Sequence, residues 1–422
     1  MSAPVVWRGA PWLAVGLLAV VVARVQELFS PLAVVRPALL GSAAVVLVLL
    51  VKTNASTWHW LARSAATRFL LAYVAWLAIT VPFALWPGLA FATVGAVLPV
   101  VAMYMAIVMC RPSWRNLDRL QLGVVIALAA FAAGSLLRGE EVVSGRLRPL
   151  GATYDPNDMA AAMAVGVMLA SGSVNRTRGV PRLIAAAAAL LLVIAIIKSG
   201  SRGGVLALGV GSVVFAIGQR GGRRLIYLAA LVFGVLVAWQ MASPVSRERL
   251  TTLLTLGSDY NVSESTGRLA VWKRGVTYFA DNPILGVGAG NFEMAEGAWL
   301  EMHGERGKWS ATHNAYLQAF ADLGIVGGVL FLSLIGVTAS RAARLWRPPT
   351  SANTASIHRP ELLAALLAFC VAALFLSLAY SGMLVALVGL TALASGAAAG
   401  EMRGVRPVGV GAHPAWIPGQ AI

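Results

Sequence analysis

Long apolar stretches divide the chain, and they limit what it can fold into more than any other feature. A helix needs roughly 17–25 apolar residues to cross the hydrocarbon core of a bilayer. Twelve stretches approach this length, several of them short: 11–30, 32–51, 69–86, 89–110, 119–138, 157–173, 181–198, 203–219, 223–242, 314–340, 361–380 and 382–399. Lipid offers no partner to open backbone groups, so the pattern predicts an all-α polytopic membrane protein with about twelve transmembrane helices.

The charge content agrees with a membrane protein. Only 12% of the residues are charged, against about 25% in soluble domains. The net charge of +16 would suit a nucleic-acid partner, but the basic residues fall in short clusters between apolar runs. We therefore expect the lipid bilayer, and no nucleic acid, as the partner of this charge. The two cysteines and five histidines form no metal-ligand motif, so neither a metal nor another cofactor is expected.

The distribution of basic residues predicts the topology. With the N-terminus in the cytoplasm, most basic residues and few acids fall on cytoplasmic segments, as the positive-inside rule requires, and both termini are cytoplasmic. One outer segment is far longer than the others, and its apolar periodicity predicts amphipathic helices at 264–280 and 291–302. The expected organisation is nine membrane helices in 1–242, a large periplasmic loop in 243–313, three membrane helices in 314–399 and a cytoplasmic tail in 400–422.

Several basic residues remain on the outer side, where positive charge is depleted. They stand in three short segments and comprise Arg146 and Arg148 (RLRPLGATYDPNDMAAAM, 146–163), Arg202 (KSGSRGG, 198–204), and Arg268, Lys273 and Arg274 (STGRLAVWKRG, 265–275). A guanidinium binds phosphate oxygens bidentately, so this repetition predicts a pocket for a strongly anionic group. Arginines that snorkel or form ion pairs at the interface are the alternative. Gly203 and Gly204 would let a ligand approach the backbone closely.

Other polar residues have two possible roles each. Asp155 and Asn157 can cap the helix that begins near Pro156, alone or in addition to binding a ligand. The tryptophans of the outer segment can stack on sugars or anchor the interface, namely Trp272, Trp299 and Trp309. The glycine-rich GVGAGNF (286–292) follows no strand of a dinucleotide fold, so nucleotide binding is not expected.

His313 and Asn314 stand at the polar end of THNAYLQAFADLGIVGG (312–328), directly before a membrane span. A histidine at the polar end of a membrane span can act as a base near neutral pH. Tyr316 lies on the same helix face as His313. A satisfied interfacial histidine, or an imidazolium that binds an anion, are the alternatives.

Four motifs together resemble those of bacterial O-antigen ligases. TGRLAVWKRGVTYFADNPILGVGAGNF followed by HNAYLQAFADLGIVGGVLFL is similar to the signature region of that family, and YDPNDMA and SGSRGG match its earlier short signatures. The resemblance spans about residues 148–335. By this resemblance His313, Arg202 and Arg268 align with the family's essential residues, whereas Arg148, Tyr154, Asp155 and Asn157 belong to matching segments.

The resemblance implies a membrane glycosyltransferase of GT-C-like architecture with an external catalytic cavity. The expected reaction is transfer of a preassembled glycan from undecaprenyl pyrophosphate to the lipid A core, at the periplasmic face of the bacterial inner membrane. Arginines would stabilise the departing pyrophosphate without a metal, and His313 would take the proton of the attacking hydroxyl. A direct attack of this kind inverts the anomeric configuration. O-antigen polymerases and protein O-oligosaccharyltransferases are similar. A transporter or flippase is a further alternative, but it predicts charges deep in the spans and repeated halves.

Overall fold

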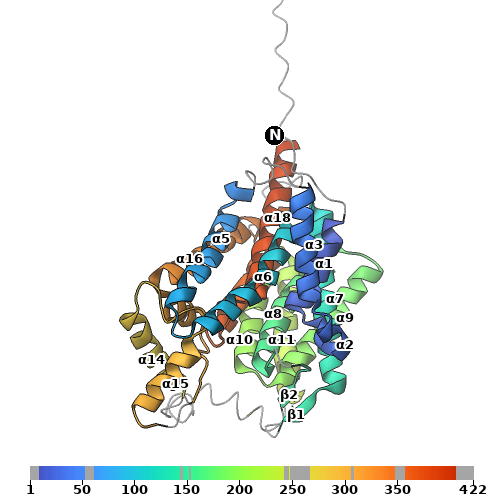
Figure 1. The fold of residues 1–422 in the computed structure, drawn as a ribbon. Helices are drawn as coiled ribbons and strands as arrows, with labels where there is room; N and C mark the ends of the chain where they lie inside the picture. The colour runs from blue at the N-terminus through green and yellow to red at the C-terminus, as the bar shows by residue number, and fades with distance from the viewer. Residues whose placement is uncertain are drawn as a thin grey trace, which may run out of the picture.

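The structure, a computed structural model, describes residues 9–52, 61–142, 146–151, 154–241, 247, 267–305, 308–346 and 357–404. Within these residues it is a helical bundle (Figure 1). The described part also contains a short antiparallel hairpin, in which β1 (Glu140–Val142) pairs with β2 (Arg146–Arg148). The predicted all-α class is therefore confirmed.

A helix occupies each of the twelve predicted apolar stretches. The helices before the hairpin are α1 (Ala10–Leu17), α2 (Ser30–Val34), α3 (Pro37–Lys52), α5 (Ala65–Thr80), α6 (Pro87–Val108) and α7 (Trp114–Arg138). Those after it are α8 (Pro156–Arg176), α9 (Val180–Ser199), α10 (Arg202–Ile217), α11 (Gly222–Met241), α14 (Arg268–Asp281), α15 (Phe292–Met302), α16 (Ala315–Trp346), α17 (Pro360–Ala373) and α18 (Gly382–Gly404).

Seven helices of the described part are long and apolar enough to cross a membrane, which makes the chain a multi-pass membrane protein. Four other apolar helices are shorter, at Ala10–Val22, Pro37–Val51, Arg202–Ile217 and Pro360–Ala373. Seven candidate spans are thus shown, and the number twelve stays a prediction.

Helix α8 lies at the centre of the bundle, where 78% of its most apolar window is buried. Small residues permit this position, because they let neighbouring backbones approach closely. A Cβ added to Gly166 would lie 2.9 Å from the side chains of both Leu128 in α7 and Leu192 in α9. Helix α8 therefore connects its two polar ends through a tightly packed apolar interior.

Helix α16 is broken at Gly324, whose φ of 66° and ψ of −167° are accessible essentially to glycine alone. The glycine-rich loop that precedes α15 packs into this break. Val287 N–H donates to Ala321 O at 2.9 Å, and Gly288 N–H donates to Asp322 O at 2.8 Å. On the far side of the break, Ile325 N–H donates to Pro283 O at 2.8 Å. The loop thus has a structural role in satisfying the interrupted helix.

Asp322, an acid within this span, reinforces the same junction. It is fully buried, and its Oδ2 accepts hydrogen bonds from Tyr380 Oη at 2.8 Å and from Gly290 N–H at 3.2 Å. The carboxylate therefore ties the loop before α15 to the connection between α17 and α18.

The predicted amphipathic segments are helices α14 and α15. Their apolar sides pack on each other and on α16, in a small core that includes Val271, Tyr278 and Phe292. Much of the predicted 243–313 loop before α14 lies outside the described residues, as does the predicted tail beyond Gly404. The periplasmic location of α14 and α15 stays a prediction.

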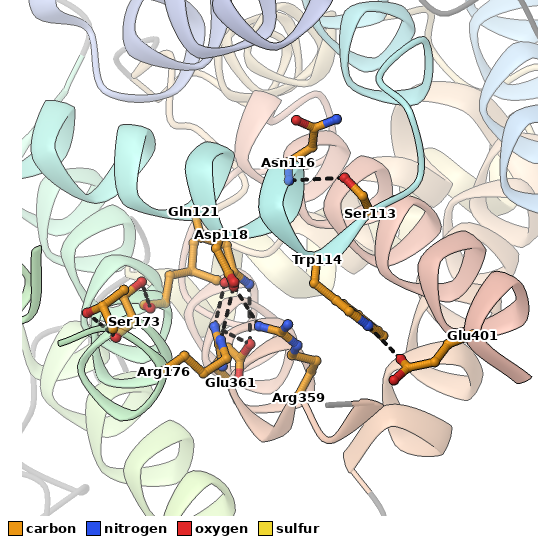
Figure 2. A network of polar contacts seen from close by, with 12 residues as sticks. Ser113, Trp114, Asn116, Asp118, Gln121, Ser173, Arg176, Arg359, Glu361 and Glu401 are labelled. Atoms are coloured by element: carbon orange, nitrogen blue, oxygen red, sulfur yellow. Dashed lines mark hydrogen bonds and ion pairs between the residues drawn. The ribbon is translucent and has the colours of Figure 1, made fainter. Parts of the chain in front are cut away.

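A cluster of ion pairs joins α7, α8 and α17 at the C-terminal end of α8 (Figure 2). Arg176 Nη2 lies 2.8 Å from Glu361 Oε1, and Arg176 Nε lies 3.1 Å from Asp118 Oδ1. Arg359 Nη1 lies 2.6 Å from the same Asp118 oxygen. The predicted topology puts this end of the bundle on the cytoplasmic side, and that location stays a prediction.

Candidate active site

A polar pocket of about 510 Å³ lies at the other end of α8. The beginnings of α8, α14 and α15 meet there with the segment that precedes α16. The lining residues are Asp155, Asn157, Arg268, Val271, Glu293, Lys308, Trp309, Ser310, Ala311 and His313. The lining combines two cations, Arg268 and Lys308, with two acids, Asp155 and Glu293. The part of the cavity formed by the two cations and the start of α14 can receive a negatively charged group.

His313 is held in this pocket by its backbone. Its φ of 48° is unusual for a residue with a side chain, and its N–H donates to Ser377 Oγ at 2.9 Å. Trp272 on α14 holds the preceding residue, because its Nε1–H donates to Thr312 O at 2.9 Å. The strained histidine is therefore fixed from two sides, an arrangement common at functional sites.

The surroundings of His313 favour its neutral form. Burial lowers the pKa of the imidazole below its usual 6.5, and the positive charges of Arg268 and Lys308 lower it further. The charge of Asp155 acts in the opposite direction but is outweighed. At neutral pH the side chain is consequently an unprotonated imidazole that can accept a proton.

Asn314 and Tyr316 fix the start of α16 behind His313. Asn314 Oδ1 accepts from the N–H groups of Tyr316 and Leu317, both at 3.0 Å, which caps the helix. The Tyr316 hydroxyl donates to Cys370 O in α17 at 2.9 Å. Neither residue lines the pocket.

Asp155 caps α8, so one of its two expected roles is confirmed. Its Oδ1 accepts from the N–H groups of Asn157 at 2.6 Å and Asp158 at 2.7 Å. Arg146 binds the same turn, donating to Asn157 Oδ1 and to Ser199 O, each at 2.8 Å. Arg146 thereby ties the pocket end of α8 to the end of α9.

Arg202 is half-buried at the first residue of α10, three residues after Ser199, and does not line the pocket itself. The nearby Ser199 carbonyl, three residues earlier in the chain, accepts the hydrogen bond from Arg146. Of the two glycines that follow, Gly204 serves helix packing, and the close approach of a ligand stays a prediction. Gly204 lies against Ala160 of α8, and Gly203 faces the side chain of Phe375.

Four further predicted residues lie outside the pocket lining. Arg148 is exposed on β2, opposite Glu140, and Lys273 is exposed on α14. The Tyr154 hydroxyl donates to Val22 O at 2.6 Å, and burial raises its pKa to about 12. The Arg274 guanidinium forms an ion pair with the buried Glu296 of α15.

The pocket also contains residues that the sequence did not single out. Lys308 is a further basic residue of the outer segment, and this position is the sequence signal by which it could have been identified. Glu293 opens α15 and is exposed overall, but partial desolvation of its carboxyl group raises the pKa of that group. Ser377, in the connection between α17 and α18, does not line the pocket but accepts the hydrogen bond of His313 N–H, and nothing in its sequence surroundings indicates this contact.

Comparison with known proteins agrees with the motifs. Residues 159–332 match the model of a family described as O-antigen ligase. This match runs from α8 into α16 and includes Arg202, Arg268 and His313.

A second match is to the exopolysaccharide production protein ExoQ of Rhizobium meliloti (strain 1021). It is 32% identical over 123 residues, which covers 28% of this chain and 27% of ExoQ. The match thus spans about a quarter of the length of that relative. The two matches together confirm the resemblance to the O-antigen ligase family. The segment that matches the family model contains the pocket residues Arg268 and His313.

Proposed function

We propose that this protein is an O-antigen ligase. It transfers a preassembled glycan from undecaprenyl pyrophosphate to the lipid A core oligosaccharide, at the periplasmic face of the bacterial inner membrane. The observation that carries the proposal is one pocket lined by His313, Arg268 and Lys308, and the lowered pKa of His313 supports it.

The donor requires anion binding. The C–O bond between the anomeric carbon and the pyrophosphate breaks, and negative charge develops on the leaving oxygen. Arg268 and Lys308 line the pocket where this charge would be held. The start of α14 adds backbone donors, because Gly267 at its N-cap provides no side-chain cap. Arg202 does not line the pocket, and its proposed part in anion binding rests on its place in the motif SGSRGG.

The acceptor requires a base. As the sugar hydroxyl attacks the anomeric carbon, its proton passes to the free imidazole nitrogen of His313, and the new C–O bond forms on the face opposite the leaving group. Such a direct displacement inverts the anomeric configuration. The lowered pKa of His313 suits a base and disfavours the alternative role as a cationic pyrophosphate ligand.

Polymerisation of lipid-linked glycan is the second candidate. The name of the relative ExoQ concerns exopolysaccharide production, which favours an enzyme that lengthens a polysaccharide. Both candidates use the same donor chemistry and the same pocket residues.

The product distinguishes the two candidates. Purified protein would be incubated with labelled undecaprenyl-pyrophosphate glycan, with and without lipid A core, in the presence of a chelator. We expect label on lipid A core and dependence on that acceptor. Label that moves into longer lipid-linked chains without lipid A core would replace ligation by polymerisation. An Arg182→Ala variant, changed at an exposed position at the other end of the bundle, serves as the control.

A further inference from the structure

One wall of the pocket combines an aromatic ring with a carboxylate. Trp309 lines the pocket and is 50% exposed. A Cβ added to Gly297 of α15 would lie 3.0–3.2 Å from three atoms of the indole, Cδ2, Cε2 and Cε3. Three nearly equal distances mean that the face of the ring lies flat on this glycine. Half of the residue's surface is exposed, which leaves area of the indole available to a ligand.

Glu293 stands one helical turn before Gly297, so the two residues share a face of α15. Its side chain is exposed and lines the same pocket. The carboxylate therefore lies beside the ring that covers Gly297. A carboxylate repels pyrophosphate, so this wall differs in chemistry from the part of the pocket that Arg268 supplies.

An aromatic face next to a carboxylate matches the chemistry of a pyranose ring. The C–H groups on one side of the sugar stack on the indole, and the hydroxyls at its edge donate hydrogen bonds to the carboxylate. Ligand pockets commonly combine apolar contact area with a few such polar groups that fix orientation.

We propose that Trp309 and Glu293 form a sugar subsite that holds a pyranose residue beside His313 during transfer. Its role in transfer rests on the proposed function. The pyranose belongs either to the acceptor or to the first sugar of the donor, and the kinetic constants distinguish these sources.

The kinetic test uses Trp309→Ala, Trp309→Phe and Glu293→Gln. Trp309→Ala should raise the KM of one sugar substrate about tenfold, as for other aromatic platforms that stack a flat or ring-shaped ligand. Trp309→Phe should retain most of the affinity, because an aromatic face remains. A raised acceptor KM assigns the subsite to the acceptor, and a raised donor KM assigns it to the donor. Trp12→Ala, at a tryptophan 67% exposed on α1, is the matched control.

A binding measurement separates this inference from the proposed function. Saturation-transfer NMR with deacylated lipid A core oligosaccharide, and separately with the free donor glycan, reports sugar contact without turnover. Contact that is present in the wild type and lost in Trp309→Ala supports the subsite even if no ligation is detected. Unchanged contact together with unchanged KM values for both substrates in Trp309→Ala and Glu293→Gln would overturn the subsite, whether or not the protein is a ligase.

Discussion

Two glycines of α16 should respond to the same substitution with opposite signs. At Gly324 the backbone adopts a conformation essentially restricted to glycine, and an added Cβ would overlap the carbonyl group of Ile284. At Gly336, in the same helix, an added Cβ meets nothing within 4 Å. The pair therefore separates the effect of the helix break from the general effect of alanine on a helix.

The magnitude for Gly324→Ala follows from the contacts at the break. Backbone strain of this kind costs about 1–3 kcal/mol. Displacement of the loop also breaks the hydrogen bonds of Val287, Gly288 and Ile325 with their partners, each worth about 0.5–1.5 kcal/mol net. We expect a loss of about 3–7 kcal/mol in the free energy of unfolding if the loop detaches completely. Gly336→Ala should instead stabilise by about 0.5–1 kcal/mol, because alanine loses less entropy in a helix.

Unfolding in mixed detergent micelles with increasing dodecyl sulfate, followed by far-UV circular dichroism, measures both variants. The loop leads into α15, which supplies a wall of the pocket, so glycan transfer should fall in Gly324→Ala even where the protein is folded. Equal stability of the two variants would refute the account of the break, as would an active Gly324→Ala protein of wild-type stability.

Three further predictions concern other parts of the molecule. Glu361→Ala removes the fully buried partner of Arg176 and should cost about 3–5 kcal/mol in the same unfolding assay, whereas the exposed Arg182→Ala should change stability by less than about 0.5 kcal/mol. Trp272→Phe keeps an aromatic ring but loses the hydrogen bond to Thr312 O, so kcat should fall while the donor KM stays nearly unchanged; a raised donor KM with normal kcat would contradict this. The base must be unprotonated, so the rate should be maximal at neutral pH and fall as the pH drops through a pKa below 6.5. Lys308→Gln removes a charge that lowers the pKa of His313, so the fall in rate at acidic pH should begin at a higher pH. A fall that begins at the same or a lower pH would show that Lys308 does not act on His313.

The local signals in the sequence were sufficient for the helices and for part of the site. Apolar length is a property of one segment, so each predicted stretch contains a helix. The number of crossings stays a prediction, because seven helices of the described part are long enough to span and four further apolar helices are shorter. The sequence motifs single out four residues that line one pocket, namely His313, Arg268, Asp155 and Asn157.

Features that depend on contacts between distant segments could not be predicted. The role of the glycine-rich loop depends on carbonyl groups that only the break in α16 leaves without helical partners. Arg274 was expected near an anion, but its partner Glu296 lies a helix away and becomes its neighbour only when α14 and α15 pack together. Glu293 and Trp309 are likewise brought together by the absence of a side chain at Gly297.

The most direct test of the central claim is the rate of glycan transfer by His313→Ala. The matched control is His303→Ala, since His303 is exposed at the end of α15 and outside the pocket. We expect transfer to fall at least about 100-fold in His313→Ala, with donor binding and unfolding behaviour retained, while His303→Ala keeps the wild-type rate. Transfer by His313→Ala at close to the wild-type rate would contradict the assignment of the base and, with it, the proposed mechanism.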